Sequence, residues 1–179
     1  MKTIQVQSYS SPCGDLLLGS FENKLCLCDW MDKERREAID KRIQNRLCAR
    51  YEKQNSDILI RAVVQLDEYF AYERKIFDIP LLFTGTEFQQ SVWQELLDIP
   101  YGRTVSYGEL ARKIGNPKAA RAVAAANGAN PISIFVPCHR VIGSNRQLVG
   151  YGGGLAAKTA LLNLEREIQL FGSEKQNPL

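Results

Sequence analysis

The residues with the clearest chemical capacity lie together in ISIFVPCHRVIG, residues 132–143, which holds Cys138 and the only histidine of the chain, His139. A regular strand would point these two neighbouring side chains to opposite faces. Pro137 indicates that a buried strand has ended, because proline donates no hydrogen bond to a central ladder. In a turn, His139 can approach the Cys138 sulfur directly or through one water. A thiolate near the imidazole and Arg140 would have a lowered pKa and act as a nucleophile.

A third group is needed to orient the imidazole, and Glu165, in the helical pattern GLAAKTALLNLERE, is a candidate. Lys158 lies seven residues earlier on the same helical face. The residues alone therefore indicate a nucleophilic cysteine without a defined substrate. The alternative is a core cysteine, because a lone cysteine after an apolar run is usually packed in the interior.

The segments around this stretch are predicted to be mostly helical. Thr86 and Gln89 form a capping-box pattern before one helix, and Ser106 caps a second, short one. Residues 116–128 begin with Asn-Pro and end with Gly, which predicts a third helix and, with the second, a helix-turn-helix. Arg121 is the one long side chain in the middle of this alanine-rich helix. It is either a solvated arginine on a packing helix or a side chain that reaches the base stack from a DNA groove.

The first half of the chain predicts a different architecture. Three alternating segments within residues 3–30 are typical of an antiparallel meander. Residues 32–47 and 56–73 carry helical patterns, with Ser56 or Asp57 as a cap, and residues 75–83 read as a further strand. These elements place the chain in the α/β (α+β) class.

The TGTE segment suggests a boundary, with an α/β domain over residues 1–84, a second domain over residues 85–173 and a disordered tail over residues 174–179. Lys/Arg and Asp/Glu balance in the first domain. Residues 100–150, in contrast, hold seven Lys/Arg against Glu109 alone. This excess favours an anionic partner, with nucleic acid as the first candidate, over a basic face that only confers solubility.

Composition sets the remaining limits. The chain has 179 residues, of which 45% are hydrophobic and 24% charged, as is usual for a globular protein. It contains no apolar run of about 18 residues, and its start lacks the apolar block of a signal peptide. We therefore expect a cytoplasmic protein whose five cysteines are reduced.

The motifs PCHRVI, GNPKAARAV and GYGGGLAAKTALLNLE occur here in one order and spacing. Together they resemble the O6-alkylguanine-DNA alkyltransferases, also called methylated-DNA–protein-cysteine methyltransferases. The similarity runs through residues 86–168 and extends more weakly into the first half through SPCGDLLLG and LDEYFAYERKIFDIPL. It implies a first domain with a ribonuclease-H-like layout and a second, mainly helical, winged-helix-like domain that contains the helix-turn-helix.

The resemblance implies a self-inactivating repair protein that moves an alkyl group from O6 of guanine, and also O4 of thymine, in duplex DNA onto Cys138. His139 would accept the thiol proton through a water, and Glu165 would hold the imidazole. Tyr107 would donate a hydrogen bond or proton to the guanine, and Asn130 would brace the turn that carries the cysteine.

Since the target base lies inside the stack, the nucleotide must be flipped out, and Arg121 matches the arginine finger that fills the space. The resemblance also implies a set of DNA contacts: Ser106, Tyr107, Ala120, Arg121, Ala122, Ala125 and Asn127. It implies a substrate pocket as well: Pro137, Val141, Tyr151, Gly152, Gly153 and Lys158, with backbone carbonyls of Cys138 and Val141 offered to guanine. Gly150 and Gly152 stand where some relatives carry asparagine and serine, so the pocket loop is either more open or more mobile.

No cofactor is expected. Some relatives bind a structural zinc through cysteines and histidines of the first domain, but this chain has no histidine before residue 139. Its four early cysteines are more typical of core or surface thiols, so we expect no metal and a monomer acting on alkylated double-stranded DNA. Two alternatives remain: a non-catalytic binder of alkylated DNA, whose relatives lack the acceptor cysteine, and a Cys-His hydrolase unrelated to DNA.

Overall fold

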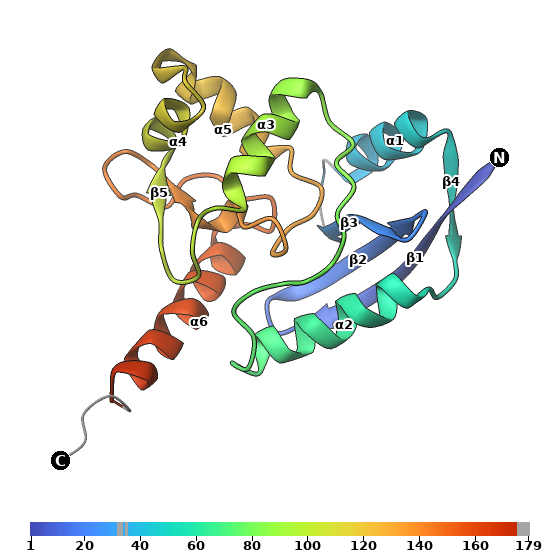
Figure 1. Ribbon diagram of the computed structural model, residues 1–179, viewed down its shortest axis with the longest axis horizontal. Helices are drawn as coiled ribbons and strands as arrows, with labels where there is room; N and C mark the ends of the chain where they lie inside the picture. The colour runs from blue at the N-terminus through green and yellow to red at the C-terminus, as the bar shows by residue number, and fades with distance from the viewer. Residues whose placement is uncertain (32–33, 35, 175–179) are drawn as a thin grey trace.

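The computed structural model describes residues 1–31, 34 and 36–174, with a four-stranded sheet at one end and a group of helices at the other (Figure 1). This arrangement confirms the mixed α/β class expected from the sequence. Among the described helices, none has both the length and the apolar character needed to cross a bilayer.

The sheet has the strand order β3-β2-β1-β4. Its first three strands form the predicted antiparallel meander, and the fourth pairs in parallel with the first. The register of the β2–β3 pair shifts between Gly19 and Ser20, so Cys26 is an extra residue in its strand. The strands are β1 (Lys2–Ser11), β2 (Gly14–Phe21), β3 (Lys24–Trp30) and β4 (Ala49–Lys53).

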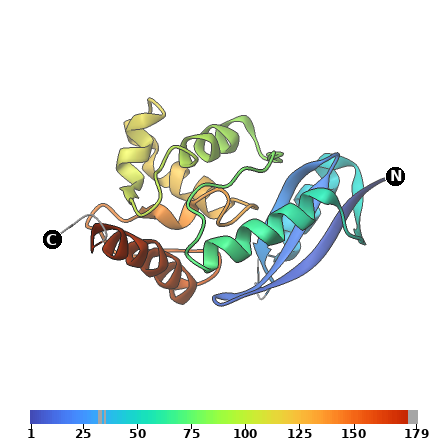
Figure 2. The same ribbon diagram turned by 60° about the horizontal axis from the view of Figure 1, so that its bottom comes forward.

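Apolar side chains project from both faces of the sheet. Leu16 and Leu18 join the large core, whereas Leu17 between them packs on the smaller one, as the period of a strand requires. Helix α1 (Arg36–Leu47) covers the smaller core with two buried isoleucines. Helix α2 (Asp57–Phe70), which Ser56 caps, contributes to the large core. Figure 2 shows α2 running along the sheet toward α6.

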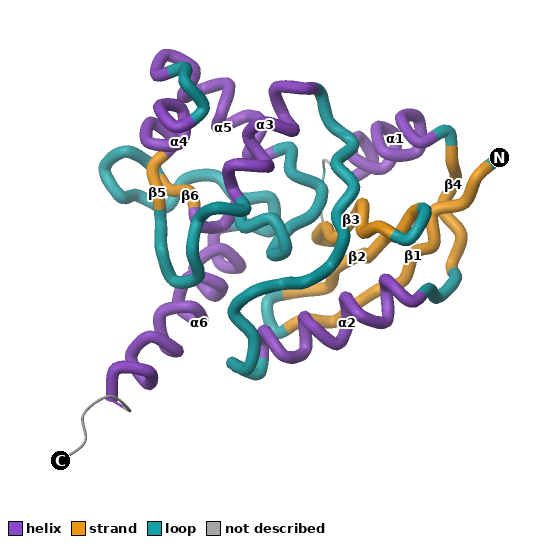
Figure 3. Tube along the Cα trace, viewed as in Figure 1, coloured by secondary structure: helices purple, strands orange, loops and turns teal. Residues whose placement is uncertain are grey.

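The prediction of a strand over residues 75–83 is wrong. This segment is drawn as loop in Figure 3, and only Leu81 makes an isolated bridge, to Leu25. Leu25 donates to Pro80 O at 2.8 Å and accepts from Leu82 N at 2.9 Å. Pro80 has no N–H to extend such pairing, so the segment crosses from the sheet to the helices in an extended but irregular form.

The second half contains both helix caps predicted from the sequence, and the structure shows that the second, at Ser106, is also a full capping box. Thr86 and Gln89 cap helix α3 (Glu87–Leu96), and Ser106 with Glu109 caps helix α4 (Tyr107–Lys113). The single helix predicted over residues 116–128 is instead a 3-10 turn, η1 (Pro117–Ala119), followed by helix α5 (Ala120–Gly128), and Asn116 makes no side-chain cap bond. Helices α4 and α5 pack against each other, as a helix-turn-helix requires.

The apolar stretch before the cysteine is buried, but it is not the predicted strand. Ile132 makes an isolated bridge to Cys28, and Phe135 N donates to Ser133 O at 2.9 Å across Ile134, whose φ is 73°. This tight turn ends the pairing with β3 after the single bridge at Ile132. The chain continues through η2 (Cys138–Arg140), β6 (Val141–Ile142), which pairs with β5 (Val105–Ser106), and helix α6 (Leu155–Glu174). The predicted tail begins at the last helical residue, Glu174, and otherwise lies outside the described residues.

Candidate active site

Cys138 is the first residue of the 3-10 turn η2 and is only 4% exposed. Its accessible side opens into a cavity of about 740 Å³ between α4, α5 and the loop that precedes α6. The walls include polar side chains and glycines: Tyr107, Asn127, Ser133, Tyr151, Gly152 and Gly153. The turn predicted at Pro137 therefore places the sulfur at the bottom of a recess.

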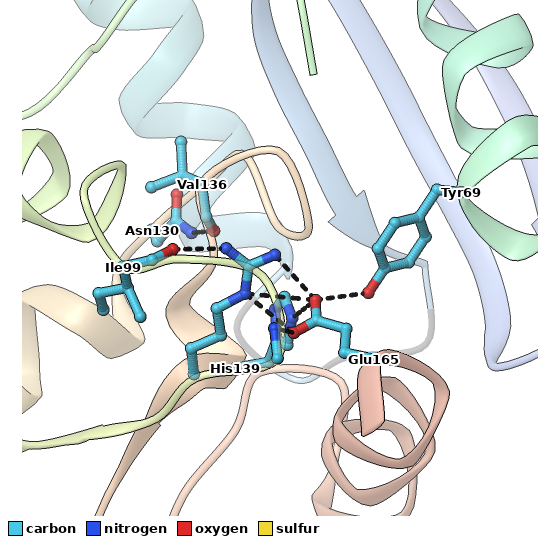
Figure 4. Close-up of polar contacts among 8 residues, drawn as sticks. Tyr69, Ile99, Asn130, Val136, His139 and Glu165 are labelled. Atoms are coloured by element: carbon cyan, nitrogen blue, oxygen red, sulfur yellow. Dashed lines mark hydrogen bonds and ion pairs between the residues drawn. The ribbon is translucent and has the colours of Figure 1, made fainter. Parts of the chain in front are cut away.

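The His139 ring is fully buried and holds Glu165 through one nitrogen only. Nε2 lies 2.7 Å from Glu165 Oε1, and Figure 4 shows the carboxylate between the imidazole and Tyr69. An ionised carboxylate only accepts, so Nε2 carries the proton. Nδ1 has no hydrogen-bond partner among the described residues and is left with a free lone pair. Burial lowers the pKa of His139, against the opposing effect of Glu165, so the ring is a neutral base.

Glu165 is the centre of a buried network. Arg140 donates to it from Nε to Oε2 and from Nη2 to Oε1, both at 2.9 Å, and from Nε to Oε1 at 3.3 Å. Gly102 N also donates to Oε2, at 3.2 Å. Burial alone would raise the pKa of this carboxyl, but His139 and Arg140 together lower it to about 2. The carboxylate is therefore ionised at neutral pH and fixed in direction by its donors.

The structure corrects the expected role of Arg140. Its guanidinium was expected near the thiol, where it would lower the pKa of the sulfur. Instead it pairs with Glu165 and donates from Nη1 to Ile99 O at 2.7 Å. Arg140 is 6% exposed, so its charge is not part of the basic surface that the sequence suggested.

Tyr69 is a site residue that the sequence analysis missed. Its hydroxyl, on helix α2 of the first half, donates to Glu165 Oε1 at 2.9 Å and is fully buried. The sequence did indicate that Tyr69 is buried, because it continues the apolar face of α2. A buried tyrosine hydroxyl needs a polar partner. The pattern could not identify that partner, which lies 96 residues along the chain.

Two asparagines fix the backbone around the cysteine. Asn130 donates from Nδ2 to Val136 O and accepts from Ile132 N, both at 2.9 Å, and so clamps the turn before Cys138. Asn127 donates from Nδ2 to the carbonyl of Cys138 at 3.3 Å. Asn127 was expected among the DNA contacts, but its side chain is buried and faces the cysteine turn.

Lys158 ties down the loop before α6. Its buried ammonium donates to three carbonyls: Val141 O at 2.6 Å, Val149 O at 3.1 Å and Gly150 O at 3.4 Å. Burial lowers the pKa of Lys158, while nearby Cys138 acts in the opposite direction. The Val141 carbonyl, expected to face guanine, thus already accepts one internal hydrogen bond.

The other pocket residues separate into two groups. Tyr151, Gly152 and Gly153 line the cavity with Cys138, whereas Val141 and Lys158 lie behind its loop. Pro137 lines a different hollow of about 620 Å³ on the far side of the turn, beside Phe135 and Tyr101.

Tyr107 stands at the mouth of the cavity at the first turn of α4. Its hydroxyl donates to Val149 O at 3.5 Å. Burial raises the pKa of Tyr107, and proximity to Cys138 raises it further, so the phenol keeps its proton at neutral pH. It can therefore act as a hydrogen-bond donor to a group inside the cavity.

The outer face of α5 is small and basic. Arg121, Ala122 and Ala125 are exposed, while Ala120 is partly buried against the core. Within the described part of the chain, the Arg121 side chain makes no hydrogen bond or ion pair. Further exposed cations lie on the neighbouring segments: Arg103, Arg112, Lys113, Lys118 and Arg146.

The four cysteines of the first half lie in different surroundings. In a regular strand, Cys26 and Cys28 would lie on the same face. Because Cys26 is the bulged residue, its side chain lies in the smaller core, whereas that of Cys28 lies in the large core. Cys48 is exposed, and burial raises the pKa of Cys26 to about 12. Among the described residues, no three His, Cys, Asp or Glu side chains gather as a metal site would require.

Two family descriptions match this chain over most of its length. Residues 4–83 match the 6-O-methylguanine DNA methyltransferase, ribonuclease-like domain, and residues 87–167 match the 6-O-methylguanine DNA methyltransferase, DNA binding domain.

Curated relatives agree. A methylated-DNA–protein-cysteine methyltransferase of Methanosarcina acetivorans is 48% identical over 88% of this chain and 95% of its own length. The constitutive enzyme of that name from Bacillus subtilis is 44% identical over 87% of this chain and 92% of its own.

Solved structures share the whole fold. The O6-methylguanine methyltransferase of Mycobacterium tuberculosis superposes with a TM-score of 0.78 at 43% identity, over 94% of this chain and 99% of that one. The same organism's OGT in complex with DNA gives 0.78 at 43% identity, over 93% of this chain and 94% of that one.

Proposed function

The chain belongs to the 6-O-methylguanine DNA methyltransferase family, and from this premise we propose that it repairs DNA by moving an alkyl group from O6 of guanine to Cys138. The Cys138 sulfur attacks the alkyl carbon, a C–S bond forms, and the C–O bond breaks with its electron pair left on the guanine. O4-alkylthymine fits the same scheme. The observation that carries the proposal is the Cys138 thiol at the bottom of a cavity, next to a buried His–Glu pair.

The thiol proton leaves through His139. Since Glu165 holds the Nε2–H, the free lone pair on Nδ1 is the base, directly or through one water. The resulting imidazolium is stabilised by a carboxylate whose pKa is lowered to about 2. Glu165 therefore positions the base and compensates its charge without taking the proton itself.

The guanine that departs needs a donor for its developing negative charge. Tyr107, with its raised pKa, is a neutral donor at the cavity mouth, and the Lys158 ammonium supplies positive charge behind the loop. The absence of side chains at Gly150 and Gly152 leaves room in the cavity for alkyl groups larger than methyl.

Double-stranded DNA is the partner, held on the exposed face of α5 and the cations around it. We propose that Ala122 and Ala125 approach the minor groove and that Arg121 occupies the space of the flipped nucleotide, because it is an exposed long side chain of α5 with no partner among the described residues. Ser106 and Ala120 flank the same face from the ends of α4 and α5.

Three further properties belong to the proposal. The proposed domain division between residues 84 and 85 lies in the gap between the two family matches, which end at residue 83 and begin at residue 87. A thiol that must be reduced to react favours a reducing compartment such as the cytoplasm, and we propose that the protein acts there as a monomer. We also propose that no metal takes part, so dialysis against a chelator should leave the transfer rate unchanged.

The test uses the purified full chain and an excess of a DNA duplex with one O6-methylguanine. The amount of guanine restored should equal the amount of protein and then stop. Repeated turnover would contradict a self-alkylating protein and support a hydrolase. Binding without any restored guanine would instead support a non-catalytic binder of alkylated DNA.

A further inference from the structure

Trp30 lies directly beneath the loop that forms one wall of the cavity. It is the last residue of β3 in the first half of the chain and is 4% exposed. Its ring meets Tyr151 edge to face, with centroids 6.0 Å apart and planes at 71°. On its other side, a Cβ added at Gly14 would lie 3.5 Å from the indole. The indole is therefore wedged between the sheet and the cavity loop.

The contact with Gly153 is the tightest of these. A Cβ at residue 153 would lie 2.6 Å from Trp30 Cε2 and 2.8 Å from Nε1, closer than packed atoms can approach. The backbone of Gly153 does not adopt a positive φ, so an L side chain is excluded by the indole and not by its own conformation. Glycine is needed here because the loop rests on the tryptophan.

The same loop determines the width of the cavity above Cys138. Its residues from Gly150 to Gly154 line the cavity on one face, and Trp30 supports the other face at Gly153. Lys158 holds the start of the loop through Val149 O and Gly150 O, so Trp30 is the support for its later part.

We propose that Trp30 is a specificity-determining residue, which sets the size of alkyl group that the protein accepts by fixing the height of residues 150–154. The inference rests on the proposed alkyl transfer. A smaller side chain at residue 30 lets the loop sink toward the sheet and deepens the cavity. Added bulk at residue 153 lifts the loop toward Cys138 and narrows it.

The experiment measures transfer rates from two duplexes of one sequence, with O6-methylguanine or O6-benzylguanine. Trp30→Leu should raise the ratio of benzyl to methyl rates at least about threefold. Gly153→Ala should lower the benzyl rate about tenfold in the wild-type background but less than about threefold in Trp30→Leu, because the vacated space accepts the new methyl group.

Gly154→Ala is the matched control. Gly154 has a φ of 87° and nothing within 4 Å of an added Cβ, so its substitution strains the backbone regardless of residue 30. Gly154→Ala should therefore change the benzyl transfer rate by the same factor in the wild type and in Trp30→Leu. If Trp30→Leu melts below the assay temperature, Trp30→Phe, which keeps a ring against Tyr151, replaces it as the background in which Gly153→Ala and Gly154→Ala are measured.

An unchanged ratio in the Trp30 variants, or an equal effect of Gly153→Ala in both backgrounds, would overturn the inference and leave the alkyl transfer intact. Failure of the wild-type protein to act on either duplex would instead contradict the proposed function.

Discussion

The two halves of the molecule contribute to the site in different ways. The helical half holds Cys138, His139 and Glu165 within 28 residues of chain, together with the exposed cations. The sheet half has balanced charge and supplies none of these reacting groups. It supplies Tyr69, which holds the carboxylate, and Trp30, which supports the cavity loop. The contrast indicates that one half carries the chemistry while the other fixes its geometry.

A similar polar cluster in the sheet half makes this contrast testable. Asp40 accepts from Arg36 Nη2 at 2.8 Å and from Tyr51 at 2.7 Å, so it has the arginine and tyrosine partners that Glu165 has. It has no histidine partner among the described residues and lies outside the cavity. Matched substitutions in the two clusters separate the loss of an internal polar network from the loss of one that takes part in the reaction.

The largest expected effect comes from the sulfur. Cys138→Ser should abolish transfer, because a hydroxyl is a far weaker nucleophile than a thiolate at neutral pH. Binding to a methylated duplex should persist, since the basic face of α5 is untouched. The transfer rate and the affinity for the methylated duplex are measured. Cys28 is another buried cysteine, and the control substitution Cys28→Ser should leave transfer intact.

The next effect is that of the carboxylate. Glu165→Gln should slow transfer about 100-fold or more, because the imidazolium loses its compensating charge. It leaves Arg140 buried without its ion pair, at a cost of about 3–5 kcal/mol in the free energy of unfolding. Asp40→Asn should lower stability without slowing transfer. Equal effects of the two substitutions on the rate would remove Glu165 from the mechanism.

Arg121 separates base flipping from chemistry. Arg121→Ala should slow repair of duplex DNA about 10- to 100-fold but slow the reaction with free O6-benzylguanine far less, because a free base needs no flipping. Arg121→Lys should rescue only in part, since lysine is a poorer stacking surface. Lys118→Ala, an exposed cation on the same segment, should only weaken binding and its salt dependence. Equal losses on both substrates would contradict the finger assignment.

The smallest of the expected effects tests the link between the halves. Tyr69→Phe should slow transfer about fivefold, because Glu165 loses one of the donors that fix it against His139 and a hydrogen bond of about 1 kcal/mol no longer holds that position. Without Tyr69, Glu165 Oε1 accepts more strongly from His139 and raises the pKa of that imidazole. The rate falls as His139 is protonated, so the acid limb of the pH–rate profile should shift to higher pH.

The control for this shift is Tyr9→Phe, which removes a 2.6 Å hydrogen bond to Asp67 outside the cavity. In the wild type, the acid limb of the profile should lie below the ordinary pKa of histidine, because burial lowers the pKa of His139. A Tyr69→Phe protein with an unshifted pH profile would make Tyr69 a packing residue only.

Local signals in the sequence were enough to predict much of the molecule. The meander, the Thr86–Gln89 capping box and the Ser106 cap follow from alternation and from local cap patterns, and the structure confirms them. Pro137 was enough to predict that Cys138 lies in a turn. These predictions depend on contacts between near neighbours in the chain.

The errors concern contacts that the sequence does not encode locally. Arg140 was assigned to the thiol because the two are close in sequence, whereas its partners Glu165 and Ile99 come from distant elements. Neither the bulge at Cys26 nor the contact of Trp30 with Gly153 has a periodic signature. Long-range packing decides such positions.

The central claim is that Cys138 alone accepts the alkyl group, and peptide mapping by mass spectrometry tests it most directly. After reaction with a duplex containing O6-methylguanine, one methyl group should be found on the peptide that contains Cys138. Burial raises the pKa of Cys13 and Cys26, which keeps these thiols protonated, and Cys48, although exposed, lies outside the cavity. A methyl group on any cysteine of the first half would contradict the account.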